Sequence, residues 1–424
     1  MLKFINPFEL LKNKRALFLL IFSTIRIILM IAINNFLTGI LNYANISTYY
    51  LVMSLYSIFV TIIIGPYGEY IEKIFFKIKK NYDITFFLES FYKRFVIPVA
   101  ILSFLILFIG FIIFQGFDNM VFIKVPLLVS LLILFRTIFD FNNSFINVLG
   151  KYKIYSLLTI SFIFLSAFFS ILFVKIYDSN YFFWTLGFVF SNMVLSIFSI
   201  LYFRRNFKSN KSRISFKIST NTNSFIPFLI LGNLMVWFLT DGFRFFAENR
   251  FGLQNSGVII LAFATASQLF SIVNNTISPI FTPDVLKGFS LTKKKDRIKS
   301  LKVFYLKTLP ILIITLITSI FFSKWILKIL IHESKINSDL IKIFIVGLIV
   351  EFIKSVISIF KQYNISENKL KYYAYPIIIP CFLIFLSPYI PYINDPYFFS
   401  IYILLIYLVY FVISYGYILK IKKI

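Results

Sequence analysis

The sequence predicts an all-α polytopic membrane protein, with twelve transmembrane helices in two six-helix lobes around a central cavity. The first observation is composition. Of the 424 residues, 59% are hydrophobic and only 14% are charged, and the mean hydropathy of +0.87 far exceeds that of a soluble domain. The second is a series of apolar runs of about 20 residues, the length that a helix needs to cross a bilayer. The third is the placement of lysine and arginine between these runs.

A basic stretch near the midpoint divides the chain. Residues 204–223 contain six lysines and arginines and no acidic residue, whereas the sequence on both sides is mostly apolar. We therefore expect an N-terminal six-helix lobe at residues 1–203, a cytoplasmic linker at 204–223 and a C-terminal six-helix lobe at 224–424. The remaining loops are too short to form a separate soluble domain.

The N-terminal half contains six apolar runs of spanning length. The first follows a basic N-terminus and is too long for the core of a signal peptide, so we expect an uncleaved first helix. The predicted spans are residues 16–37, 46–66, 95–114, 125–149, 155–174 and 181–203. A basic amphipathic loop separates the second span from the third.

The C-terminal half contains six more runs, and Asp241 and Arg244 interrupt the first of them. The predicted spans are residues 224–247, 258–282, 303–322, 340–360, 372–390 and 397–419. With an even number of spans in each half, both halves enter the membrane in the same direction. Transporters built from parallel repeats have this arrangement, with a substrate path between the repeats.

Lysine and arginine indicate the orientation, because they are enriched in cytoplasmic loops. With a cytoplasmic N-terminus, 31 of the 43 lysines and arginines lie in segments that face the cytoplasm. Only five lie in the opposite segments, namely Lys124, Lys175, Lys324, Lys328 and Lys335. We predict a multi-pass protein of the bacterial inner membrane with both termini in the cytoplasm. The net charge of +26 then points to anionic lipid headgroups and the insertion machinery as partners, and not to nucleic acid.

Charged residues inside the predicted spans are candidate functional residues, because each is costly within a membrane helix. Arg26 is in the middle of the first span and has no acidic residue within four positions. Arg136 and Asp140 are four residues apart, and Glu351 and Lys354 are three apart, so each pair shares a helix face. The pairs either line a hydrated cavity for a phosphate-bearing substrate or neutralise each other and fix helix packing. For Arg26 we favour a role in the cavity.

The sequence contains no motif of an enzyme. It lacks the glycine-rich GxxxxGK[ST] loop of nucleotide-binding proteins and the HExxH motif of zinc proteases. The one histidine, His332, lies in a short polar segment, and the one cysteine, Cys381, lies in an apolar run. These two residues cannot supply a zinc site or a catalytic Cys–His pair. We therefore predict a transporter that has no catalytic residue, bound metal or cofactor.

Three segments carry a resemblance to a known family. Residues 239–270, LTDGFRFFAENRFGLQNSGVIILAFATASQLF, resemble the junction of helices seven and eight in polysaccharide and O-antigen flippases of the multidrug/oligosaccharidyl-lipid/polysaccharide exporter superfamily. The matching positions are Asp241, Arg244, Gly252, Leu253 and Gly257. Residues 146–160 resemble the turn between helices four and five of that family, and residues 65–75 resemble the end of its helix two.

The resemblance implies a flippase for surface polysaccharide assembly, such as that of the O-antigen of lipopolysaccharide. Such a protein moves an undecaprenyl-pyrophosphate-linked oligosaccharide from the inner to the outer leaflet by alternating access. The implied partners are this glycan, membrane lipids, and polysaccharide polymerase and chain-length proteins.

The resemblance also implies roles for the candidate residues. The substrate phosphate would be bound in the cavity by Arg26, Arg136 and Lys354. The candidates for coupling to protons or sodium ions are Asp140 and Glu351. The gate at the outer end of helix seven would be formed by Asp241 and Arg244.

Three alternatives remain. A multidrug cation antiporter has the same architecture, but its cavity should carry net acid. The charges in the middle of the spans are instead Arg26, Arg136 and Lys354 against Asp140 and Glu351. A flippase for a lipid-linked peptidoglycan precursor would be expected to have more than twelve spans. An O-antigen polymerase or ligase would be expected to carry a large outside loop, which the sequence lacks.

Overall fold

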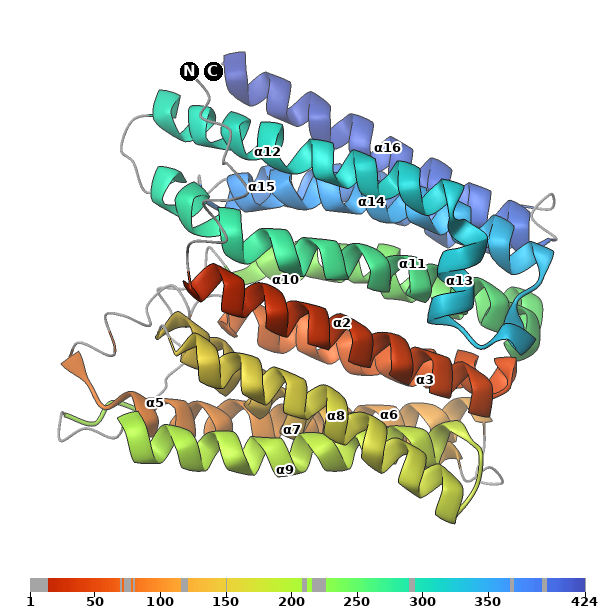
Figure 1. Cartoon of the computed structure of the whole chain (residues 1–424), viewed down its shortest axis with the longest axis horizontal. Helices are drawn as coiled ribbons and strands as arrows, with labels where there is room; N and C mark the ends of the chain where they lie inside the picture. The colour runs from red at the N-terminus through yellow and green to blue at the C-terminus, as the bar shows by residue number, and fades with distance from the viewer. Residues whose placement is uncertain are drawn as a thin grey trace. The chain divides into compact units, whose positions relative to one another are not determined.

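The computed structural model of the chain consists of long helices (Figure 1). It describes residues 14–68, 71, 78, 81–115, 121–149, 151–207, 212–215, 226–289, 294–366, 370–390 and 395–423. Within these residues the β-structure is limited to one isolated bridge, between Tyr82 and Ser212. The predicted all-α fold class is confirmed, and each of the twelve predicted spans falls on a helix.

The first half of the chain forms helices with the following bounds: α2 (Lys14–Ile40), α3 (Tyr43–Phe59), η1 (Val60–Ile64), α5 (Ile84–Phe91), η2 (Tyr92–Val96), α6 (Ile97–Gln115), α7 (Val121–Val148), α8 (Tyr152–Ile176) and α9 (Tyr181–Phe207). Segments η1 and η2 are π-helical turns that continue their neighbouring helices. Asp83 caps α5, because its side chain accepts hydrogen bonds from the backbone N–H groups of Thr85 and Phe86.

The second half forms helices with the following bounds: α10 (Ile226–Trp237), η4 (Phe238–Gly242), α11 (Phe243–Phe289), α12 (Lys294–Phe321), α13 (Ser323–Leu330), η5 (Glu333–Lys335), α14 (Ser338–Ser366), α15 (Leu370–Leu386), η6 (Ser387–Tyr389) and α16 (Pro396–Lys423). Segment η4 is a π-helical turn, and η5 and η6 are 3-10 turns. Among the described residues, six helices are long and apolar enough to cross a membrane, and the bent pair of α12 and α13 would add a seventh.

Packing divides the chain into two compact units. Unit 1 consists of Met1–Ser47 and Phe238–Ile424, and unit 2 of Thr48–Trp237. Helix α2 therefore packs with the C-terminal helices, and α10 packs with the N-terminal ones. The two predicted lobes follow the order of the chain, whereas these units are defined by contacts, so the lobes and the cavity between them stay a prediction.

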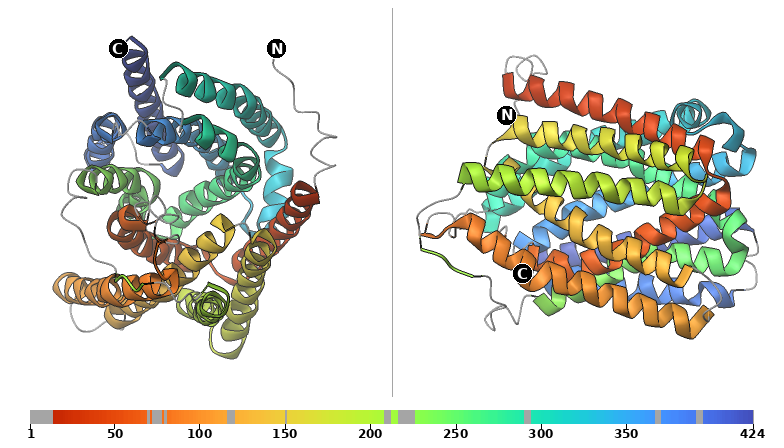
Figure 2. Two further views of the ribbon diagram at one scale, coloured as in Figure 1. Left: turned by 90° about the vertical axis from the view of Figure 1, so that its left-hand side faces the viewer. Right: turned by 90° about the horizontal axis from the view of Figure 1, so that it is seen from below.

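Unit 2 is held together by close helix contacts at small residues. Helices α8 and α9 lie side by side along their lengths (Figures 1 and 2). A Cβ atom added to Gly187 would be 2.3 Å from the backbone nitrogen of Ser170, and the hydroxyl oxygens of Ser166 and Ser191 are 2.8 Å apart. Small residues let membrane helices approach closely enough for such contacts.

Polar side chains of α7 also join the helices of unit 2. The hydroxyl of Tyr92 donates to Oδ1 of Asn142 at 2.8 Å, and Nδ2 of Asn142 donates to the hydroxyl of Ser199 at 3.1 Å. The amide is therefore satisfied on both sides by two other helices, as a buried polar group must be. This contact accounts for part of the polar character that the sequence shows in this span.

The described part of the predicted linker packs against α5. The backbone N–H of Asp83 donates to the carbonyl of Ser212 at 3.1 Å, and the guanidinium of Arg94 donates to the hydroxyl of Ser215 at 3.3 Å. Residues 208–211 and 216–223 of the predicted linker lie outside the described residues.

In unit 1, α11 contains a sharp break at Gly252. This residue has φ 70° and ψ 169°, a conformation that only glycine adopts readily. The break divides α11 into the end of the seventh span and the whole of the eighth. Arg250 lies just before the break, and its guanidinium donates to the carbonyls of Ser387 and Ile390 at 2.5 and 2.7 Å. These bonds join the end of the seventh span to the turn that follows α15.

The start of α3 fits closely against α11. The hydroxyl oxygens of Ser47 and Ser256 are 3.0 Å apart, and a Cβ atom added to Gly257 would be 2.4 Å from the carbonyl oxygen of Tyr43. Gly257, which the family resemblance singled out, is thus required by a close approach of two backbones.

We expect the substitution Gly257→Ala to destabilise the protein by roughly 1–3 kcal/mol, because the added methyl group overlaps a backbone carbonyl that cannot move alone. Gly416→Ala in α16 is the matched control, since a Cβ atom there meets nothing within 4 Å. The control should be neutral or stabilise the helix slightly. Thermal unfolding in detergent measures both, and equal melting temperatures for the two variants would contradict the close approach.

Candidate functional site

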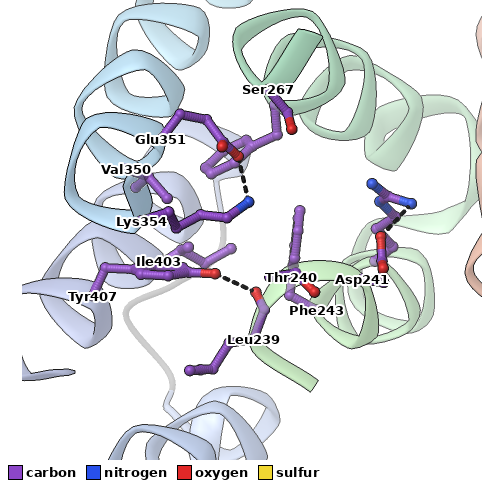
Figure 3. A pocket seen from close by; sticks show the side chains of 12 residues that line it. Leu239, Thr240, Asp241, Phe243, Ser267, Val350, Glu351, Lys354, Ile403 and Tyr407 are labelled. Atoms are coloured by element: carbon purple, nitrogen blue, oxygen red, sulfur yellow. Dashed lines mark hydrogen bonds and ion pairs between the residues drawn. The ribbon is translucent and has the colours of Figure 1, made fainter. Parts of the chain in front are cut away.

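A cavity of about 180 Å³ lies within unit 1 (Figure 3). It is bounded by η4 and α11 on one side and by α14 and α16 on the other. The lining residues are Leu239, Thr240, Asp241, Phe243, Arg244, Phe263, Ser267, Val350, Glu351, Lys354, Ile403 and Tyr407. Apolar walls thus surround seven side chains that carry a charge or a hydroxyl group.

Two ion pairs face this cavity. Nη1 of Arg244 is 2.9 Å from Oδ1 of Asp241, and Nζ of Lys354 is 2.5 Å from Oε1 of Glu351. The partners in each pair are three residues apart on one helix, so each helix positions its own pair. Figure 3 shows Asp241 on the opposite side of the cavity from Glu351 and Lys354. The Glu351 side chain is only 9% exposed, so its contact with Lys354 is its main compensation for burial.

The π-helical turn η4 places Asp241 in the wall of the cavity. The hydroxyl of Tyr407, on α16, donates to the carbonyl of Leu239 in this turn at 3.0 Å. The bond is buried and joins two helices that are far apart in the sequence (Figure 3). Single π-helical turns often occur at functional sites, because they alter the register of the side chains that follow.

The cavity offers chemistry for both signs of charge. Its carboxylates, Asp241 and Glu351, and its cations, Arg244 and Lys354, are equal in number, so its formal charge is balanced. The carboxylates could bind a proton or a hard cation, and the cations could bind an anion such as phosphate. Across the residues described, no group of three or more histidine, cysteine, aspartate and glutamate side chains could hold a metal ion.

Four of the seven predicted site residues therefore line one cavity: Asp241, Arg244, Glu351 and Lys354. The helix continues past Asp241 and Arg244 to the break at Gly252, so both lie within the helix and not at its end. Their predicted role as a gate, and that of Glu351 in ion coupling, stay predictions.

The predicted pair of Arg136 and Asp140 belongs to unit 2 and is not among the residues that line this cavity. Nε of Arg136 is 3.4 Å from Oδ2 of Asp140. The Arg136 guanidinium also lies over the rings of Tyr56 on α3 and Phe188 on α9, 5.4 and 5.1 Å from their centroids. Cation–π contacts of this kind stabilise an arginine within a membrane protein. The Asp140 side chain is 55% exposed, and a carboxylate in mid-membrane at that exposure requires a wet or polar environment.

Arg26 lies on α2 in unit 1 and is half-buried. It does not line the cavity, and within the described ranges no acidic side chain lies at ion-pair distance from it. The structure therefore places Arg26 and Arg136 in different units, and their joint role in binding phosphate stays a prediction.

Sequence analysis missed three polar residues of the cavity: Thr240, Ser267 and Tyr407. Tyr407 is one of 26 tyrosines, and no pattern distinguishes it from those near span ends. The residue that follows Ser267 is Gln268, which does not line the cavity. Its amide bonds to α2 instead, where Nδ2 of Asn34 donates to its Oε1. This contact helps to explain why α2 packs within unit 1.

Comparisons with known proteins identify the fold. No family model matches the sequence, and no curated protein matches it either. Solved structures do match, and each of those given below covers 95% of this chain. They include an inward-facing multidrug resistance MATE family transporter of the MOP superfamily, with a TM-score of 0.61, 10% identity and 95% of that chain covered. They also include an outward-facing transporter of the same description, with a TM-score of 0.57, 11% identity and 94% of that chain covered.

A third match is a MOP superfamily transporter from Pyrococcus furiosus, described as having a binding pocket of reverse polarity that suggests a different function. Its TM-score is 0.60, with 12% identity and 94% of that chain covered. The chain thus has the fold of MATE transporters of the MOP superfamily, the superfamily to which the sequence resemblance pointed. All three of these structures are described as transporters.

We expect Lys354→Met to destabilise the protein because it leaves the buried Glu351 carboxylate without its partner. Glu351→Gln/Lys354→Met should recover much of the loss, since neither a charge nor an unpaired ion remains. The coupling energy in this double-mutant cycle should be roughly 1–3 kcal/mol. Thermal unfolding of the two single variants and the double variant measures it. Strictly additive effects would show that the ion pair contributes nothing.

Proposed function

We propose that this protein is a flippase that moves an undecaprenyl-pyrophosphate-linked oligosaccharide repeat unit across a bacterial inner membrane for surface polysaccharide assembly. The observation that carries the proposal is the charged cavity inside unit 1, where cations and carboxylates face each other among membrane helices. Charged residues within membrane helices are costly and usually mark a path for substrates or ions. Transport by alternating access is consistent with this fold, because solved structures with the fold include both an inward-facing and an outward-facing conformation.

The balance of charge favours an anionic substrate. Among the intramembrane residues that the sequence singled out, the basic ones are Arg26, Arg136, Arg244 and Lys354, and the acidic ones are Asp140, Asp241 and Glu351. Each of these acids already has a basic partner. Arg26 is then the cation among these residues that has no acidic partner in the described ranges, and it neutralises part of the negative charge of a pyrophosphate group. The planar guanidinium binds phosphate oxygens in a bidentate geometry.

In this mechanism, Arg26 and Arg136 contact the substrate phosphates, and the cavity couples transport to an ion. Glu351 accepts a proton or a sodium ion, which releases Lys354 to contact an anion. The loss of the ion pair alters the packing of α14 against α11, the helix that continues from η4. Turn η4 carries Asp241 and is bonded to Tyr407. Asp241 and Arg244 then act as the gate. Asp140, exposed in unit 2, is the second candidate for ion coupling.

A multidrug cation antiporter is the second candidate. Two solved structures with this fold are described as multidrug resistance transporters, and the cavity contains two carboxylates. A site for organic cations should nevertheless carry net acid, whereas both carboxylates here are paired with bases. The balanced charge of the cavity therefore favours the flippase.

Deletion of the gene distinguishes the two functions. We expect loss of the surface polymer together with a complete lipid-linked repeat unit stranded on the cytoplasmic leaflet. Gel analysis of surface glycan and mass spectrometry of undecaprenyl-linked intermediates in inverted membranes measure this, and also identify the sugar. Normal surface glycan with raised sensitivity to cationic dyes would instead establish the antiporter.

Complementation of the deletion with variants tests the phosphate-binding arginines. Arg26→Ala and Arg136→Ala should each lower glycan export at least about tenfold, because each removes a charge-assisted contact with phosphate. Lys151→Ala, at an exposed position outside the helices, is the control and should export normally. The amount of protein in the membrane must be equal in all strains. Normal export by both arginine variants would exclude the proposed phosphate site.

A further inference from the structure

The short helix α13 has the geometry of a helix that lies on a membrane surface. Helix α12 ends at Phe321, and the chain turns by 88° into α13 (Figure 1). Helix α12 corresponds to the predicted ninth span. A helix at nearly a right angle to the end of a transmembrane helix runs along the plane of the membrane, at the level of the headgroups.

Seven of the eight residues of α13 divide among three faces, and the eighth, Ile326, is half-buried. Ser323, Leu327 and Leu330 are buried where the helix packs on the rest of unit 1. Trp325 and Ile329, one turn apart, are 69% and 56% exposed. The third face is formed by the exposed side chains of Lys324 and Lys328. Phenylalanines at the bend, Phe321 and Phe322, add to the apolar surface.

An apolar face with a tryptophan and a lysine-rich edge is the composition that interfacial helices share. The indole ring is enriched at the headgroup level, where its apolar body and its N–H group are both accommodated. In water, the exposed side chains of Trp325, Ile329 and the adjoining phenylalanines would form an uncovered apolar patch. A bilayer covers such a patch when the helix lies at its surface.

The lysines at and after α13 give this surface a local positive charge. Three of the five lysines that the sequence places outside the cytoplasm, Lys324, Lys328 and Lys335, lie within twelve residues of one another. Nζ of Lys328 is 3.3 Å from Oε1 of Glu333, and both side chains are exposed. Lys335 lies over the ring of Tyr43, and burial lowers the pKa of its amine. Lys324 is exposed and, in the described part of the chain, has no acidic partner.

We propose that α13 is an interfacial helix that binds anionic phospholipids at the membrane surface where α12 ends. Trp325 and Ile329 insert between the acyl chains just below the headgroups, and Lys324 and Lys328 contact the headgroup phosphates. The negative phosphate groups of lipids complement this local excess of lysine. Each lysine near an anionic lipid surface contributes about 1 kcal/mol of attraction. The proposal does not depend on the substrate of the transporter.

Lipid binding at α13 would be transmitted to the turn between α2 and α3. The backbone N–H of His332, just after α13, donates to the hydroxyl of Thr38 at 2.9 Å. The hydroxyl of Tyr43 donates to the carbonyl of Lys335 at 2.5 Å. The segment that follows α13 is thus bonded to both sides of this turn, so a lipid that holds α13 also holds the outer end of α2.

Tryptophan fluorescence tests the insertion. The chain has three tryptophans, and Trp184 and Trp237 are only 2% and 5% exposed. With the full-length protein in nanodiscs, lipids brominated near the headgroup end of the acyl chain should quench wild-type emission, and Trp325→Phe should abolish this quenching. Equal quenching of wild type and Trp325→Phe, or strong quenching of Trp325 by aqueous iodide, would overturn the insertion.

A second measurement tests the headgroup preference. The protein is placed in nanodiscs of phosphatidylglycerol and phosphatidylcholine, and quenching is measured twice, once with only phosphatidylglycerol brominated and once with only phosphatidylcholine brominated. The ratio of the two quenching values gives the enrichment of anionic lipid near Trp325. We expect about fivefold enrichment for wild type, a value near one for Lys324→Gln/Lys328→Gln, and no change for Lys175→Gln. Added inorganic phosphate should leave the ratio unchanged. A wild-type ratio of one, or a ratio that the double substitution leaves unchanged, would overturn the proposed lipid contact.

Discussion

Charge inside the membrane is the constraint on which this structure depends. A charged side chain in a membrane helix must be paired or hydrated, because the lipid offers no compensation for lost water. The protein meets this requirement mostly within single helices, through pairs at i,i+3 or i,i+4: Arg136 with Asp140, Asp241 with Arg244, and Glu351 with Lys354. Each of these three pairs enters the membrane with no net charge, whereas Arg26 on α2 has no such partner in the described ranges.

Pairs of this kind also make a site that can be switched. A proton or cation that binds one carboxylate releases its basic partner, and an anion that binds the base releases the carboxylate. In the cavity of unit 1 two such pairs share one space, so a change in one alters the field at the other. The buried bond from Tyr407 to the π-helical turn η4 links this electrostatic change to the backbone of the seventh span.

Helix packing in both units uses small and polar residues as well as buried apolar ones. The carbonyl of Tyr43 packs closely against Gly257, and the backbone at Ser170 packs closely against Gly187. Asn142 forms hydrogen bonds with two neighbouring helices. In lipid, apolar side chains gain little by meeting each other, since acyl chains are equally apolar. Close backbone contact and interhelical hydrogen bonds therefore supply the specificity that a hydrophobic core gives to a soluble protein.

The sequence by itself determined the helices, their approximate ends, the fold class, and two of the three charged pairs, Arg136 with Asp140 and Glu351 with Lys354. Run length sets a span, and covalent spacing along a helix sets its near neighbours. Only the tertiary structure decided that Asp241 and Glu351 share a cavity, that Tyr407 and Ser267 belong to it, and that α2 packs with the C-terminal helices. Both the lipid-facing and the protein-facing sides of these helices are apolar. The sequence therefore carries little information about which face of a helix meets which neighbour, and packing alone determines it.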